Sequence, residues 1–202
     1  TGSTYRYFHP DRIVADLDIL VNRFGAEAIF FIDDNFCFKK ARVKEVCDAL
    51  IQSRLGQKCK FSLQTRADNF YPEVIPMLRE AGFTSVGFGM ETGVERLAQL
   101  IHKGETLQCH IDAVRLAQKH GMDVALFMIF GFPTETHADR VNTVKLVNSL
   151  KPTFIKYNNL MPYPGTPIYE DVKDTPRMNK VGYWENFTSA LAEMGLPLTN
   201  RR

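Results

Sequence analysis

Apolar and polar positions follow a regular order along this chain, in which five mostly apolar runs are separated by longer stretches of helical periodicity. The runs predicted to be strands are Ala28–Ile32, Cys59–Gln64, Thr84–Met90, Val124–Phe130 and Phe154–Met161. They are apolar at nearly every position instead of every second one, which is typical of strands in a sheet that is covered on both faces. A parallel sheet with helices packed against it is therefore expected.

The stretches beside these runs carry apolar residues at helical spacing, the pattern of a helix with one buried face. Helices are predicted at Asp11–Phe24, Lys40–Leu55, Pro72–Glu80, Glu105–His120 and Glu135–Leu150. Gly25, Gly56 and Gly82 follow the first three, and glycine commonly ends a helix because it tolerates a left-handed backbone.

Strict alternation of strand and helix predicts the α/β class, as a partial, open TIM-type (β/α) barrel of about five parallel strands. The chain begins with a helix, so the first barrel strand is expected to be missing, which leaves Ala28–Ile32 as an edge. An exposed apolar edge favours self-association. Residues 1–170 are assigned to the barrel, and residues 171–202 to a tail with a short helix at Asn186–Met194.

A polar or glycine-rich patch follows each predicted strand. In a (β/α) barrel, the functional side chains lie at the carboxyl ends of the strands. We therefore expect Asp33, Asp34, Arg66, Glu91 and Glu135 on one rim, although they are far apart in the sequence.

Composition and charge narrow the function classes. The 25 basic and 23 acidic residues give a net charge of +2, which does not favour nucleic-acid binding. No apolar run is long enough to span a membrane, and the N-terminus has no signal-peptide pattern. The four cysteines, Cys37, Cys47, Cys59 and Cys109, form no Cys-x-x-Cys pair, and a reducing cytoplasm fits them best.

Two carboxylate patches are candidate binding sites. Asp33 and Asp34 would repel each other if buried together, so they need a cation, hydrogen-bond donors or water. A ligand ammonium group or a metal would meet that need, whereas the alternative is a solvated turn that caps the next helix. Glu91 follows Gly87 and Gly89, which indicate close approach of a ligand or another backbone. Its carboxylate can accept hydrogen bonds from sugar hydroxyls, or it caps the next helix.

Two further features are weak when taken alone. The backbone amides of the loop 131–136 can read the edge of a flat ring, or Glu135 merely favours the dipole of the following helix. Arg66 is either an anion clamp or a salt-bridge partner. The five histidines lack the spacing of a metal-binding helix, so neither a metal ligand nor a catalytic residue is assigned.

Five motifs occur in a fixed order along the chain: Phe30–Phe36, Gly82–Gly93, Lys103-Gly104, Ile129–Thr136 and Pro162–Tyr169. Together they resemble the radical S-adenosylmethionine superfamily, over roughly residues 5–170. The similarity is greatest to the branch that often has an upstream cobalamin-binding domain, which includes the anaerobic magnesium-protoporphyrin IX monomethyl ester cyclases. The motifs are specific for the superfamily and much less specific for the reaction.

The resemblance implies that S-adenosylmethionine is held against a 4Fe–4S cluster, which generates a 5′-deoxyadenosyl radical for oxidoreductase, cyclase or methyltransferase chemistry on a small molecule. It places Asp33 and Asp34 at the methionine amino group and Glu91 at the ribose. Ile129 and Gly131 match the adenine-side motif. Arg66 occupies a polar rim position with no firmer role, and cobalamin is a further cofactor of this branch.

One feature of the family is absent from these 202 residues, namely the Cys-x-x-x-Cys-x-x-Cys cluster loop. The four cysteines cannot replace it, because cluster ligation needs thiolates that converge. The chain is therefore expected to be a core fragment, inactive without the upstream loop. The alternatives are a lyase or aldolase in which Asp33, Asp34 and Glu91 bind a divalent metal, and a non-catalytic binding module that has lost its cluster.

Overall fold

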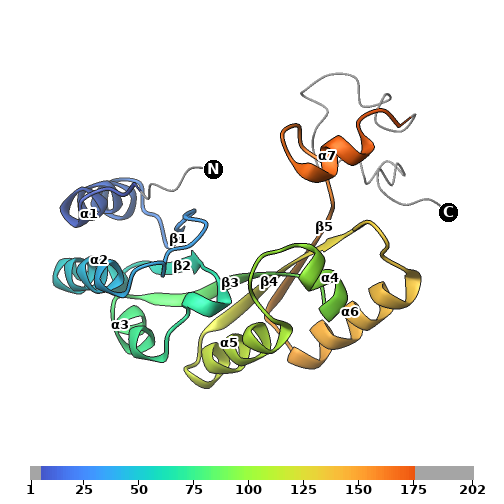
Figure 1. Ribbon diagram of the computed structural model, residues 1–202. Coiled ribbons are helices and arrows are strands. Elements are labelled where there is room, and N and C mark those ends of the chain that lie inside the picture. Colours follow the sequence, from blue (N-terminus) through green and yellow to red (C-terminus); the bar gives the residue numbers. More distant parts are fainter. Residues whose placement is uncertain (1–5, 176–202) are drawn as a thin grey trace. The chain divides into compact units, whose positions relative to one another are not determined.

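The structure, a computed structural model, describes residues 6–175. The helices and strands follow one another in the order shown in Figure 1. The α-helices are α1 (Pro10–Asp18), α2 (Lys40–Ser53), α3 (Ile75–Glu80), α4 (Glu95–Leu100), α5 (Leu107–Lys119), α6 (His137–Leu150) and α7 (Pro167–Val172). The strands are β1 (Ala28–Phe30), β2 (Lys60–Gln64), β3 (Phe83–Glu91), β4 (Asp123–Phe130) and β5 (Phe154–Asn159).

The five strands form one sheet in chain order, β1-β2-β3-β4-β5. β1 pairs in parallel with β2, with Ala28 opposite Lys60, and β2 pairs in parallel with β3, with Leu63 opposite Val86. β1 is therefore a terminal strand of the sheet, as the sequence predicts. The chain divides into two compact units, residues 1–89 with 108–125 and residues 90–107 with 126–202.

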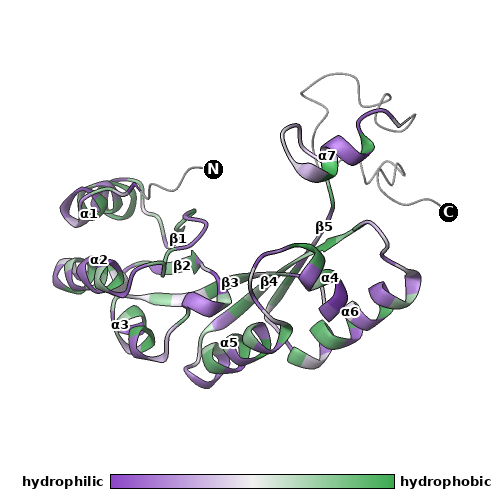
Figure 2. Ribbon diagram, in the orientation of Figure 1, coloured by the Kyte–Doolittle hydropathy of each residue, from purple (hydrophilic) through white to green (hydrophobic). Residues whose placement is uncertain are grey.

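The first unit has an aromatic core. Phe31, Phe36, Phe61 and Phe83 lie with neighbouring ring centroids 5.2–5.8 Å apart. Helix α2 packs its apolar face inward, since its buried residues include Val43, Val46, Cys47 and Leu50. Hydrophobic and hydrophilic residues alternate along this helix (Figure 2). The predicted amphipathic pattern is therefore the one that builds this core.

A glycine pair lets two backbone segments of the first unit touch. A Cβ on Gly56 would lie 2.3 Å from the carbonyl oxygen of Ala81, and a Cβ on Gly82 would lie 2.6 Å from the Cα of Gly56. Gly82 also has a φ of +102°, which an L side chain rarely adopts. The turn that leads into β3 therefore requires glycine on both sides of the contact.

The predicted helices are confirmed, with changes at their ends. The first continues from α1 into a π-helical turn, η1 (Ile19–Arg23), and the third begins as a 3₁₀ turn, η4 (Pro72–Val74). The fifth begins at His137 instead of Glu135, because Thr136 is the N-cap and forms a capping box with Asp139. Two further 3₁₀ turns, η2 (Leu55–Gln57) and η3 (Ala67–Asn69), complete the elements of residues 6–175.

Helices α4 and α7 were not predicted, because each has only six residues and shows little helical periodicity. Helix α3 is equally short, but η4 directly precedes it and lengthens its helical pattern. The boundary at residue 170 stays a prediction, and the predicted helix Asn186–Met194 lies outside the described residues. Among residues 6–175, no helix has the length and apolar composition that a membrane crossing requires.

Candidate functional site

Asn35 joins the loops that follow β1 and β2. Its Oδ1 accepts hydrogen bonds from the Thr65 hydroxyl at 2.7 Å and from the Arg66 backbone N–H at 3.3 Å. Its Nδ2 donates to Asn69 Oδ1 at 2.6 Å. The Phe36 N–H donates to the carbonyl of Gln64 at 3.0 Å, so the two loops are fixed side by side at the carboxyl ends of their strands.

Asp33 and Asp34 lie in the first of these loops and are exposed to solvent. Neither carboxylate has a hydrogen-bond or ion-pair partner among residues 6–175. Neither residue caps α2, because Lys39 is the N-cap of that helix. Both carboxylates are therefore open to solvent and to a cationic ligand group.

A cavity of about 730 Å³ lies beside β1 in the first unit. Most of its wall is formed by apolar side chains of α1, β1 and α2, and Asp33 also contributes to the wall. Arg42 also lines it and is 8% exposed. Its guanidinium donates to the Phe8 carbonyl, lies 4.6 Å from the Tyr7 ring centroid and pairs with Glu45 at 3.3 Å, so it ties the segment before α1 to α2.

Arg66 follows β2 and is engaged by its neighbour. Its Nε donates to Asp68 Oδ1 at 2.9 Å, and its Nη2 donates to Asp68 Oδ2 at 2.6 Å. Of the two roles that the sequence allows, the structure shows the salt bridge. A bidentate pair of this kind holds the guanidinium plane in a fixed orientation.

Glu91 is the last residue of β3 and lies in the second unit. Its φ is 65°, in the left-handed region that a residue with a side chain seldom adopts. Its Oε1 accepts from Lys103 Nζ at 3.1 Å, and the same ammonium lies 3.5 Å from Glu105 Oε2. Glu91 does not cap α4, because Val94 is the N-cap of that helix.

The turn after Glu91 is fixed against α6. The Gly93 N–H donates to the hydroxyl of Thr143, a residue with no exposed surface, at 3.0 Å. A Cβ on Gly93 would lie 2.7 Å from the Cα of Thr143, so only glycine allows this approach. The motif Glu91-Thr92-Gly93 therefore places a carboxylate on a strained backbone, at a turn that packs directly on a helix.

The loop after β4 is held by Glu135. Its fully buried carboxylate accepts from the Gly131 N–H at 2.6 Å and from Arg140 Nε at 3.0 Å. Glu135 therefore occupies the Gly131 amide in this structure. That the backbone of loop 131–136 reads the edge of a flat ring stays a prediction. The helix-dipole alternative for Glu135 is also too simple, because its carboxylate points back into the loop.

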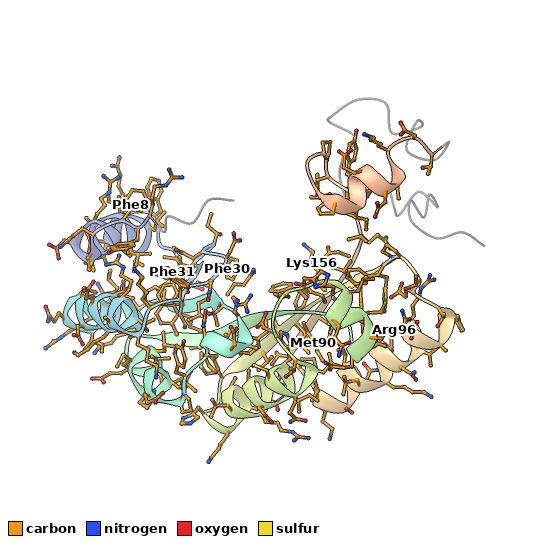
Figure 3. All side chains as sticks on the ribbon, in the orientation of Figure 1. Phe8, Phe30, Phe31, Met90, Arg96 and Lys156 are labelled. Atoms are coloured by element: carbon orange, nitrogen blue, oxygen red, sulfur yellow. The ribbon has the colours of Figure 1, made fainter. Side chains whose placement is uncertain are left out.

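The second anchor of this loop is Arg96 of α4. The side chain of Arg96 is labelled in Figure 3. Its guanidinium donates to the Thr134 hydroxyl at 2.8 Å and to Asp139 of α6 at 2.7 Å. The Asp139 carboxyl also accepts from the backbone and hydroxyl of Thr136, and these bonds, with Arg96 beside it, lower its pKa. Loop 131–136 is thus tied at both ends within the second unit.

Ile129 lies near the end of β4 and is half-buried. Val124, Leu126 and Met128, which alternate with it, are fully buried. Because successive side chains of a strand point to opposite faces, Ile129 is on the less covered face of the sheet. Glu91, Ile129 and Gly131 all belong to the second unit, whereas Asp33, Asp34 and Arg66 belong to the first. That the two groups line one rim stays a prediction.

Sequence reasoning missed the residues that hold these groups in place, namely Asn35, Lys103, Glu105 and the loop-anchoring role of Glu135. Lys103 lies in one of the motifs that carry the resemblance, and this position could have marked it as a candidate site residue. Asn35 also lies in a motif, but its partners Thr65 and Asn69 do not, so no pattern in the sequence indicates their contact.

The cysteines do not fit a cluster. Cys37, Cys47 and Cys59 are buried, with Cys37 in the loop after β1, Cys47 in α2 and Cys59 just before β2. Burial raises the pKa of the Cys37 and Cys47 thiols to about 12, so both stay protonated near neutral pH. Within residues 6–175, no three His, Cys, Asp or Glu side chains converge on a metal position.

Residues 1–147 match the Radical SAM superfamily. An uncharacterized methyltransferase of Pyrococcus horikoshii is 31% identical over 169 residues, 84% of this chain and 36% of that protein. The anaerobic magnesium-protoporphyrin IX monomethyl ester cyclase of Cereibacter sphaeroides is 23% identical over 172 residues, 84% of this chain and 28% of that protein. The chain therefore spans about a third of the length of these relatives.

The fold is similar to that of a solved radical S-adenosylmethionine methyltransferase, TsrM from Kitasatospora setae, with cobalamin and a 4Fe–4S cluster bound. The TM-score is 0.74 at 19% identity, over 87% of this chain and 34% of that chain. Together with the sheet order, this likeness confirms the predicted class, an α/β fold with five parallel strands of a partial TIM-type barrel.

Proposed function

Because this chain belongs to the Radical SAM superfamily, whose members use S-adenosylmethionine and a 4Fe–4S cluster, we propose that it is the S-adenosylmethionine-binding core of such an enzyme. The observation that carries the proposal is Glu91, an oriented carboxylate that is one-fifth exposed at the carboxyl end of β3. Its strained backbone fits a functional position, since such strain gathers at active sites and ligand clamps.

Each candidate residue has a role that its chemistry allows. Asp33 and Asp34, exposed and unpaired, receive the methionine ammonium group. Glu91 accepts hydrogen bonds from the ribose hydroxyls. Ile129 packs against adenine, and Gly131 contributes its backbone without its amide N–H. Arg66 shapes the rim through its pair with Asp68.

In this proposal, the residues of this chain bind and orient S-adenosylmethionine and exclude water from it. The cluster ligands come from a Cys-x-x-x-Cys-x-x-Cys loop in a longer chain, so the 202 residues alone are inactive. The relatives favour methyl transfer or cyclisation on a small molecule as the reaction class. The cobalamin bound in TsrM favours that cofactor as a further component of the longer protein.

The test is S-adenosylmethionine binding by a longer chain that carries the cluster loop ahead of residue 1, measured by isothermal titration calorimetry. Replacing Glu91 by Ala should weaken binding about ten- to a hundredfold, because hydrogen bonds to a charged acceptor are lost. Glu80→Ala, which removes an exposed carboxylate at the end of α3, is the matched control and should leave the affinity unchanged. Equal affinity of the Glu91→Ala and Glu80→Ala proteins would remove Glu91 from the site.

Two alternative functions can be distinguished from this proposal by experiment. A metal-dependent lyase or aldolase would bind Mg²⁺ or Mn²⁺ without S-adenosylmethionine, and the described residues offer no converging ligand set for that ion. A binding module that has lost its cluster would bind S-adenosylmethionine but would have no cluster loop in the natural sequence upstream of Thr1.

A further inference from the structure

Strand β5 carries a lysine and an asparagine on one of its faces. Lys156 and Asn158 alternate with Ile155 and Tyr157, and both lysine and asparagine are uncommon in strands. Because successive side chains of a strand point to opposite faces, Lys156 and Asn158 share a face. Lys156, which is labelled in Figure 3, is exposed, and its ammonium has no ion-pair partner among residues 6–175. The ammonium is therefore available to a ligand.

A ring contact shows which face of the sheet this is. The Tyr157 ring stacks on the Phe130 ring, with 5.1 Å between centroids and 7° between planes. Phe130 shares a face of β4 with Leu126 and Met128, which have no exposed surface. Tyr157 is therefore on the covered face of the sheet, and Lys156 is on the opposite face.

The register of β4 and β5 follows from one backbone hydrogen bond. In the parallel pair of β1 and β2, an N–H donates to the carbonyl of the residue just before its opposite residue. The Leu160 N–H donates to the Phe130 carbonyl at 2.7 Å, which by the same geometry sets Leu160 opposite Gly131. Counting back along both strands sets Asn158 opposite Ile129.

The side of β4 and β5 that carries Lys156 is called the open face below, and it consists of Phe127, Ile129, Phe154, Lys156 and Asn158. The same count sets Lys156 opposite Phe127, and Phe154, two residues before Lys156, is 56% exposed. A free ammonium thus lies beside two aromatic side chains, with an amide nearer the carboxyl end of the strand. The open face contains no acidic residue, so it is complementary to an anion that has an apolar body.

We propose that the open face binds the substrate of the proposed enzyme, and that this substrate is an aromatic or conjugated molecule with a carboxylate that Lys156 binds. This inference rests on the proposed function. The rings supply apolar contact area, the ammonium supplies the opposite charge, and the Asn158 amide can donate a hydrogen bond. Ile129, proposed to pack against adenine, is on the same face, so substrate and adenosine lie next to each other. All five residues belong to the second unit.

An edge strand offers another explanation for the lysine. Lysine on an edge strand hinders pairing with a second chain, and β5 is a terminal strand of the sheet. That role predicts that Lys156→Met self-associates in sedimentation velocity and that carboxylate binding is unaffected. Such a result would contradict the substrate proposal.

The test compares two probes with the same ring system, 1-naphthoate and the neutral 1-naphthamide. Affinities for the 202-residue chain are measured by ligand-observed NMR titration. The unmodified protein should prefer naphthoate about three- to fivefold, the effect of one partly exposed ion pair. Lys156→Met should abolish the preference, and Lys156→Arg should keep it because the cation remains. Lys145→Met, which removes an exposed lysine of α6, is the matched control and should also keep it.

The outcomes separate this inference from the proposed function. No preference in the unmodified protein, an unchanged preference in Lys156→Met or an equal loss in Lys145→Met would each overturn the carboxylate site. These titrations contain no S-adenosylmethionine, so their result does not depend on it. Failure of the longer chain to bind S-adenosylmethionine would overturn the proposed function and would leave a Lys156-dependent naphthoate site standing.

A second measurement uses the unmodified sequence and does not require a neutral variant to fold. Reductive ¹³C-dimethylation keeps the charge of each lysine and gives each an NMR signal, and the Lys156 signal is the one missing from Lys156→Arg. Naphthoate should shift this signal and naphthamide should not, while the Lys145 signal, identified in the same way, stays in place. A Lys156 signal that naphthoate does not move would contradict the proposal.

Discussion

At the residue scale, the candidate ligand-binding carboxylates were easier to predict than the residues that hold them in place. Asp33, Glu91 and Glu135 stand out in the sequence because they follow apolar strands. Lys103 and Asn35 act through contacts that are long-range in the chain, 12 residues for Lys103 to Glu91 and 30 for Thr65 to Asn35. No local pattern reports such contacts, so the sequence indicates where ligand groups lie but not what orients them.

The buried carboxylate of Glu135 should contribute measurably to stability. Glu135→Ala leaves the Gly131 amide and the Arg140 guanidinium without their acceptor, and losing a buried, charged acceptor costs about 1–3 kcal/mol. Urea unfolding followed by circular dichroism measures the change. Glu170→Ala, which breaks an exposed pair with Lys173, should cost less than about 1 kcal/mol. Similar losses in the two variants would show that the Glu135 contacts contribute little.

At the element scale, the periodicity of the chain identified all five strands and five of the seven α-helices of residues 6–175. The observed helix ends differ from the predicted ones where a capping residue sets the start of a helix, as Thr136 does for α6. They also differ where a π-helical turn extends a helix, as after α1. The short helices α4 and α7 depend on tertiary contacts more than on local pattern. The contact of Gly93 with α6 joins two distant elements, and only the folded chain shows why that position needs glycine.

The Gly93 contact gives a prediction on packing. Gly93→Ala would force a Cβ to within 2.7 Å of the Thr143 backbone, and such overpacking costs about 1–3 kcal/mol. Thermal unfolding should show a lower midpoint. Thr143→Ser keeps the hydroxyl that accepts from Gly93 and should cost less. A Gly93→Ala protein as stable as the parent would mean that the turn and α6 can move apart freely.

The β1 edge gives a prediction on association. Phe30, the last residue of β1, is 48% exposed, and Ile32, two residues later, is 84% exposed. Among residues 6–175, β1 pairs with β2 alone. We expect the 202-residue chain to self-associate through this edge, as measured by sedimentation velocity, and Ile32→Lys to reduce association. Phe24→Lys replaces an exposed apolar residue at the end of η1 and is the control. An equal effect of both substitutions would locate the association elsewhere.

At the scale of the whole molecule, the parallel sheet in chain order agrees with the partial barrel of the superfamily to which the chain belongs. The sequence predicted the fold class through strand and helix alternation and the superfamily through its ordered motifs. It could not predict which contacts hold the candidate side chains within each unit, because those contacts join positions that no motif links. The cysteines lie in separate elements. We therefore propose that this chain binds S-adenosylmethionine but cannot hold the 4Fe–4S cluster.

The most direct test of this proposal compares two proteins side by side. The 202-residue chain and a longer chain with an upstream cluster loop are reconstituted with iron and sulfide without oxygen, and iron content and 5′-deoxyadenosine formation are then measured. The longer chain should bind one 4Fe–4S cluster and form 5′-deoxyadenosine on reduction, while the 202-residue chain should do neither. A stoichiometric cluster in the 202-residue chain, or none in the longer chain, would contradict the account.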